Sequence, residues 1–148
     1  MKKAEISTIN NQNQRIRIII GVIIMLIIAA IHGFRIGSYL TGNAYIYYYS
    51  FASDIMLPFG AYFMLCMNEI QLRFLRKWYV KVIIVFGVMA FSEIMQYYGI
   101  YLFGVTFDWI DILMYGIGAF IAAFLDKQIL ERLMPFWKLK DLSVEMPN

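Results

Sequence analysis

The sequence predicts an all-α fold, an integral membrane four-helix bundle with both termini in the cytoplasm. Apolar residues make up 61% of its 148 residues and charged residues only 16%, whereas soluble domains carry about 25% charged residues. The apolar residues gather in four runs, each close to the length of about 20 residues that crosses a bilayer as a helix. Lys and Arg cluster before the first run, between the second and third runs, and after the fourth run. We therefore expect one multi-pass domain in a lipid bilayer.

The runs divide the chain into three parts. Residues 1–14 are polar and rich in Asn and Gln, so we expect a flexible N-terminus there. Residues 134–148 form a basic interfacial C-terminal tail, predicted to lie on the membrane surface because basic and apolar residues alternate in and before it. Residues 15–133 hold the four-helix transmembrane domain, with helices expected at about 16–34, 51–72, 79–101 and 109–125.

The first run is expected to be a permanent anchor. Arg15 and Arg17 precede it, as basic residues precede a signal peptide, but the run is long and no A-x-A cleavage site follows it. Residues 35–50, after the run, contain Gly, Asn and Thr together with a group of tyrosines. Tyrosine places its ring in the apolar zone and its hydroxyl in the wet one, so this segment is predicted to be an interfacial loop.

The basic residues predict the orientation of the bundle. Twelve of the thirteen Lys and Arg residues fall within residues 2–17, 73–81 and 127–140, which are the N-terminal side, the connection between the second and third helices, and the C-terminal side. Only Arg35 lies on the other side of the membrane. Basic residues mark the cytoplasmic side of membrane proteins. The net charge of +3 therefore marks a cytoplasmic face that attracts anionic headgroups.

Several classes of chemistry find no support in the sequence. No basic stripe with interleaved aromatic residues is present, so no nucleic-acid binding is expected. The lone Cys66 excludes an internal disulfide, and neither a His/Cys cluster for zinc nor a glycine-rich phosphate loop occurs. The sequence therefore predicts no cofactor and no resident metal. Whether the protein is an enzyme stays open, because no nucleophile stands out.

Acidic residues point to a site in the outer half of the membrane. Asp54, Glu93, Asp108 and Asp111 all fall there. An ionisable side chain at the centre of a membrane helix costs at least about 2.5–3.5 kcal/mol, so such residues usually face the bundle interior and have a function. Glu93 is the most costly of the four, and Gln96 shares its helix face because it lies three residues on.

Arg35 is the only basic residue on the outer side, so we expect it to offset these carboxylates, with His32 nearby. The predicted ligand-binding residues of one outward-facing polar cavity are Glu93, Gln96, Asp108, Asp111, Asp54 and Arg35. Structural roles stay open for the same residues. Asp108 or Asp111 would cap the fourth helix, Glu93 and Gln96 would join helices, and Arg35 would contact lipid headgroups. Glu69, near the cytoplasmic side, is expected to be hydrated or paired with Arg73.

Two of these segments resemble VanZ-like membrane proteins. These proteins share a Glu-x-x-Gln on one helix, here residues 93–96, and paired aspartates followed by a stripe of small residues on the next, here 107–118. Residues 53–62 resemble the equivalent segment of a related bacterial domain family, and Tyr115, where VanZ proteins often have Asn, favours that relative. The resemblance covers roughly residues 51–126. It implies a role in the cell envelope, a place in the bacterial cytoplasmic membrane, and a link to tolerance of glycopeptide antibiotics.

Three classes of function follow from these observations. The first is a cell-envelope protein whose outer cavity binds a polar envelope molecule, such as a lipid headgroup or a lipid-linked precursor, with enzymatic action on it as a subset. The second is a small proton or cation transporter, which would require oligomerisation to form a pore. The third is an accessory or scaffold subunit without a ligand, whose polar residues only hold helices together.

The predicted topology has a direct test. Single cysteines placed at Ser38 and Thr41 should react with an impermeant thiol reagent in intact cells, because both lie in the outer loop. Cysteines at Ser7 and Ser143 should react only after permeabilisation. Labelling of Ser143→Cys in intact cells would mean an odd number of spans and would exclude the four-helix arrangement.

Overall fold

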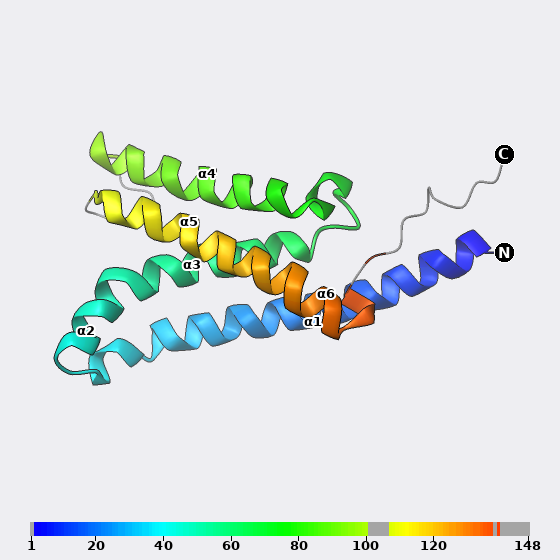
Figure 1. Ribbon diagram of the computed structural model, residues 1–148, viewed down its shortest axis with the longest axis horizontal. Helices are drawn as coiled ribbons and strands as arrows, with labels where there is room; N and C mark the ends of the chain where they lie inside the picture. The colour runs from blue at the N-terminus through cyan, green and yellow to red at the C-terminus, as the bar shows by residue number, and fades with distance from the viewer. Residues whose placement is uncertain (1, 101–106, 138, 140–148) are drawn as a thin grey trace.

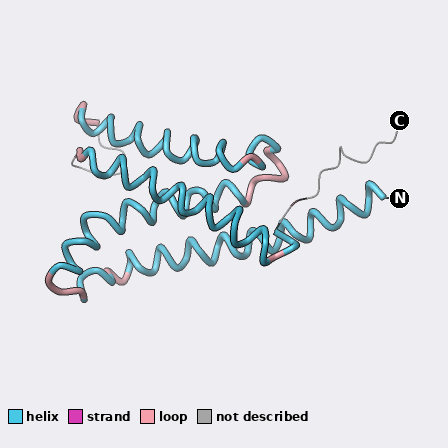
Figure 2. Tube along the Cα trace, in the orientation of Figure 1, coloured by secondary structure: helices cyan, strands magenta, loops and turns pink. Residues whose placement is uncertain are grey.

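The computed structural model describes residues 2–100, 107–137 and 139. Every regular element in these residues is helical, and four long helical segments lie side by side (Figures 1 and 2). The predicted all-α bundle is confirmed. Three helices are long and apolar enough to cross a membrane, at Thr8–Gly33, Trp78–Tyr97 and Trp109–Leu133. The chain is therefore a membrane protein.

The first helix, α1, spans Lys2–Gly33 and begins well before residue 16, where the sequence placed it. The predicted helix start at about residue 16 is therefore wrong, because the polar residues from Lys2 onward belong to the same helix. No Gly or Pro occurs before Gly21, and Lys, Glu and Gln are good helix formers, so nothing in the polar segment breaks the helix. Gln14 also donates to the Met67 carbonyl, which holds this part of α1 against the bundle.

The second long segment is continuous over residues 43–66. It consists of α2, Asn43–Tyr47, a π-helical turn, Tyr48–Ala52, and α3, Ser53–Cys66. The sequence placed this helix at 51–72, too late at both ends. Gly42, with φ of 60°, precedes the true start, and the chain leaves the helix after Cys66 into turns and a 3-10 helix, Arg73–Arg76.

The third long helix, α4, spans Trp78–Tyr97. It ends earlier than the predicted residue 101 because Gly99 adopts a left-handed conformation with φ of 80°. The Ile100 amide donates to the Met95 carbonyl and the Gly99 amide to the Gln96 carbonyl, both at 2.9 Å. This pair of hydrogen bonds is the Schellman motif that closes many helices at a glycine.

The fourth long segment begins with α5, Trp109–Phe124, at the residue that the sequence predicted. It continues through a π-helical stretch, Leu125–Leu130, into α6, Glu131–Leu133, and a 3-10 turn, Pro135–Trp137. Trp137 is buried, so the expected surface tail is wrong at this position. Residues 138 and 140–148 of that tail lie outside the described residues.

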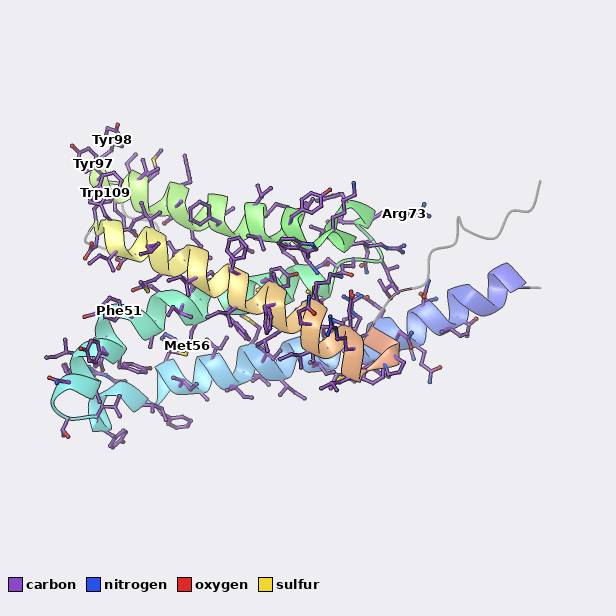
Figure 3. All side chains as sticks on the ribbon, viewed as in Figure 1. Phe51, Met56, Arg73, Tyr97, Tyr98 and Trp109 are labelled. Atoms are coloured by element: carbon purple, nitrogen blue, oxygen red, sulfur yellow. The ribbon has the colours of Figure 1, made fainter. Side chains whose placement is uncertain are left out.

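The arrangement gives the bundle two distinct ends. α3 packs against α1, α4 and α5. The outer end, named after the predicted orientation, holds α2, the end of α4 and the start of α5 (Figure 1, left). The inner end holds the N-terminal half of α1 and α6 (Figure 1, right). The aromatic residues Tyr97, Tyr98 and Trp109 lie at the outer end and Arg73 at the opposite one (Figure 3).

α3 and α5 approach each other closely at a glycine. A Cβ atom at Gly118 would lie 2.3 Å from the Ile55 carbonyl oxygen and 2.7 Å from Pro58 Cγ. Small residues at helix contacts let membrane helices approach in this way. Because Asp54 lies one residue before Ile55, this contact also fixes the distance between the acidic starts of the two helices.

Gly118→Ala should therefore destabilise the protein by about 1–3 kcal/mol, the usual cost of overpacking. Gly116→Ala on the same helix is the matched control, since its Cβ would meet only Phe86 ring atoms at 3.6 Å or more. Thermal unfolding of the purified protein in detergent measures both. Equal unfolding temperatures for the two variants would contradict the close packing of α3 on α5.

Candidate functional site

The outer end gathers five of the six residues that the sequence predicted for the ligand-binding cavity. They come from the start of α3, the end of α4, and the start of α5 with the residue before it. These elements lie together at the left of Figure 1. The five residues are Asp54, Glu93, Gln96, Asp108 and Asp111.

Glu93 is the centre of this group. Its side chain is 1% exposed, and three neutral donors reach it. The Asp108 amide donates to Oε1 at 2.9 Å, and Gln96 Nε2 and the Tyr115 hydroxyl donate to Oε2 at 3.1 and 3.2 Å. The carboxylate is thus stabilised by dipoles instead of a cation, and it joins α4 to α5. Sequence reasoning placed Tyr115 only in the small-residue stripe and missed its hydrogen bond to Glu93.

Asp108 has the capping role that the sequence left open for it. Its Oδ1 accepts a hydrogen bond from the Ile110 amide at 2.9 Å, which satisfies one of the free donors at the start of α5. Its own amide is bound by Glu93, so the two carboxylates together fix the first turn of α5. Asp108 also lines the cavity described next, so capping and cavity lining coexist in one residue.

Asp54 and Asp111 both line an open cavity of about 450 Å³. Their carboxyl groups lie within hydrogen-bonding reach of each other. Two carboxylates in contact repel unless a proton or a cation lies between them. Pro58 lies inside α3 and has no N–H to bond the Asp54 carbonyl. The residues that line this cavity are Tyr49, Ser50, Phe51, Ser53, Asp54, Asp108, Ile110 and Asp111.

Arg35, the sixth predicted residue, does not neutralise these carboxylates. Within the described part of the chain it forms no ion pair, and it lies in an adjoining pocket of about 170 Å³ with His32. The expectation of a counter-charge inside the acidic cavity is therefore wrong. The reason is local: α1 ends at Gly33, and Arg35 adopts a left-handed conformation with φ of 50° at the start of a 3-10 turn, Ile36–Tyr39.

A second charged cluster, which sequence reasoning missed, lies at the inner end. Lys81 is fully buried and its Nζ lies 2.5 Å from Glu69 Oε1 and 2.9 Å from Asp126 Oδ2. Arg17 pairs with the same Glu69 at 2.8 Å. Asp126 also accepts hydrogen bonds from the Tyr62 hydroxyl at 2.7 Å and from Trp137 Nε1 at 2.6 Å. The cluster thus holds two positive and two negative groups, all buried.

The inner cluster has the ligand types of a metal site but is already filled. Cys66, Glu69 and Asp126 present ligand atoms within 4.8 Å of one another. Lys81 Nζ contacts all three, at 3.1 Å from Cys66 Sγ and at the two carboxylate distances given above. An ammonium therefore occupies the position that a cation would take. A sequence signal was present, because the basic Lys81 and the acidic Glu69 and Asp126 all lie beside apolar runs. Glu69 was nevertheless expected to be hydrated or paired with Arg73, and Lys81 was counted with the connection between the second and third helices.

The two clusters differ in charge balance and access. The inner cluster is neutral overall and closed. The outer cavity is open and acidic, and no basic residue lines it within the described part of the chain. A further groove of about 250 Å³ beside Trp78 and Phe120 is largely apolar, and its one charged residue, Lys127, pairs with Glu131. The outer cavity is therefore the candidate ligand site.

Comparisons of the chain with protein-family models, with curated proteins and with solved structures find no match. The resemblance to VanZ-like proteins thus stays a prediction that rests on the motif residues alone. Of those residues, Glu93, Gln96, Asp108 and Tyr115 are joined by hydrogen bonds at the outer end. The fold and the geometry of the two clusters are the findings on which any functional conclusion depends.

Proposed function

We propose that this chain is a VanZ-like protein of the bacterial cytoplasmic membrane whose outward-facing cavity binds a polar envelope molecule. The molecule would be a lipid headgroup or a lipid-linked precursor. Binding of such a molecule, rather than a reaction, is the proposal, because the described cavity offers no activated nucleophile. A link to glycopeptide tolerance would follow from altered handling of envelope precursors.

The observation that carries the proposal is the contrast between the two ends. In the inner cluster both carboxylates, Glu69 and Asp126, have a cationic partner. At the outer end Asp54 and Asp111 meet without one, in a cavity of about 450 Å³, within the range of small-molecule sites, about 300–1,000 Å³. Acidic groups that lie together without a cation lower the stability of the fold. Arrangements that lower stability in this way are expected mainly at functional sites.

A scaffold role explains the inner cluster better than the outer one. Polar groups that only hold helices together are paired with each other, as Lys81 and Asp126 are. A transport role gains support from these inner charges, which the sequence reading lacked. Buried apolar residues nevertheless separate the two clusters: Val85 and Met89 along α4, and Ala119 and Ala122 along α5. This apolar layer favours binding at one end over conduction between the ends.

Copurifying lipid provides the test. The double variant Asp54→Asn and Asp111→Asn should keep its abundance in the membrane, since the amides preserve size and hydrogen bonding. It should lose the envelope lipids or precursors that native mass spectrometry detects on the wild-type protein. Glu131→Gln, which neutralises an acidic residue near the inner end, is the control and should retain them. A double variant that disappears from the membrane would favour the scaffold role, and one that keeps the wild-type lipids would exclude the cavity as their site.

A further inference from the structure

The outer end carries two adjoining pockets of opposite charge. The larger, about 450 Å³, contains Asp54, Asp108 and Asp111. The smaller, about 170 Å³, contains Arg35 and His32. Tyr49 and Ser53 line both pockets and so form a shared wall. A ligand that occupies both pockets would contact the Arg35 guanidinium in the smaller one and carboxylates in the larger one.

The cationic side fits a phosphate. Arg35 is exposed and has no ion-pair partner in the described part of the chain. A guanidinium presents a planar fork of N–H donors that matches phosphate oxygens in pairs. His32 is already engaged, because its ring nitrogens contact the Ile28 carbonyl at 2.9 Å and Ser53 Oγ at 3.2 Å. Arg35 is thus the group that remains available to an anion.

The acidic pocket would bind a group that carries a positive charge and N–H donors. Asp54 and Asp111 need a proton or a cation between them. The three carboxylates Asp54, Asp108 and Asp111 all line the cavity, and no basic residue of the described chain lines it with them. A primary ammonium has three N–H donors and one positive charge, and it would satisfy this arrangement.

We infer that the ligand of the outer site is a zwitterionic headgroup that joins a phosphate to a primary amine, as in an aminophospholipid. This inference rests on the proposed function, since it names the ligand of that same cavity. The phosphate binds at Arg35 and the ammonium lies among Asp54, Asp111 and Asp108. The lipid is favoured over a soluble compound because exposed aromatic residues, Tyr39, Tyr45, Tyr47 and Trp109, surround this end as in a membrane interface.

Lipid titrations of the full chain in detergent, followed by native mass spectrometry, test the inference. Phosphatidylethanolamine should bind about tenfold more tightly than phosphatidylglycerol, which lacks the amine, and than phosphatidylcholine, whose ammonium has no N–H donors. Asp54→Asn with Asp111→Asn should abolish this preference. Arg35→Gln should weaken phosphatidylethanolamine and phosphatidylglycerol alike, whereas Arg73→Gln, an exposed arginine at the inner end, should change neither.

The outcomes separate this inference from the proposed function. Equal affinity for phosphatidylglycerol and phosphatidylethanolamine, with both dependent on Arg35, would overturn the amine and leave the headgroup site standing. Soluble glycerophosphoethanolamine that binds as tightly as the lipid would overturn the lipid assignment. If none of these phosphate-bearing probes binds to the folded wild-type protein, the aminophospholipid falls; the proposed function falls with it only if no envelope lipid or precursor copurifies with the wild-type protein either.

Discussion

The buried ammonium of Lys81 is the interaction on which the rest of the structure depends. A charge in a low-dielectric interior must be paired, and Lys81 is fully buried between Glu69 and Asp126. These partners lie after α3 and after α5, so one side chain on α4 joins three helical segments. Arg17 adds α1 through Glu69, and Trp137 adds the last described turn through Asp126. The inner cluster is therefore neutral and buried, and it joins all four long helical segments.

Because the inner cluster joins the helices at one end, their positions at the outer end, where carboxylates lie without a cationic partner, are also restricted. The close contact at Gly118 then holds α3 against α5, and the acidic starts of these helices cannot move apart to relieve their repulsion. Glu93 accepts hydrogen bonds from the Asp108 amide, Gln96 and Tyr115, which join α4 to the start of α5. The inner cluster and the contact at Gly118 together hold the acidic cavity in a preformed arrangement.

The sequence predicted the features that follow from one helix at a time. Four apolar runs gave the four-helix bundle, and the 93–96 spacing placed Glu93 and Gln96 on one face, where the structure has them hydrogen-bonded. The acidic residue before Trp109 marked the start of α5 correctly. The helix ends were less predictable. Nothing in the polar residues after Lys2 stops a helix, whereas Gly99 closes α4 and was a signal that the prediction of residue 101 overlooked.

Features that depend on how helices meet were not predictable in the same way. The pairing of Lys81 with Asp126 joins residues 45 positions apart, and only the packing of α4 on α5 brings them together. For Glu69, Arg73 is nearer in sequence than Lys81, yet the structure pairs Glu69 with Lys81. Arg35 was assigned to the carboxylates because it was the only outer cation. Its left-handed backbone, which periodicity does not reveal, places it in the adjoining pocket instead.

The central claim is that the inner charges hold the fold and the outer charges are kept for a ligand. The free energy of unfolding of two matched variants, Asp126→Asn and Asp111→Asn, tests it most directly. The first should lose about 3–5 kcal/mol, because it removes the partner of a buried charge. The second should lose nothing or gain stability, because it relieves a repulsion and its amide can donate to Asp54. A loss at Asp111 as large as that at Asp126 would show that the outer carboxylates are structural and would contradict the account.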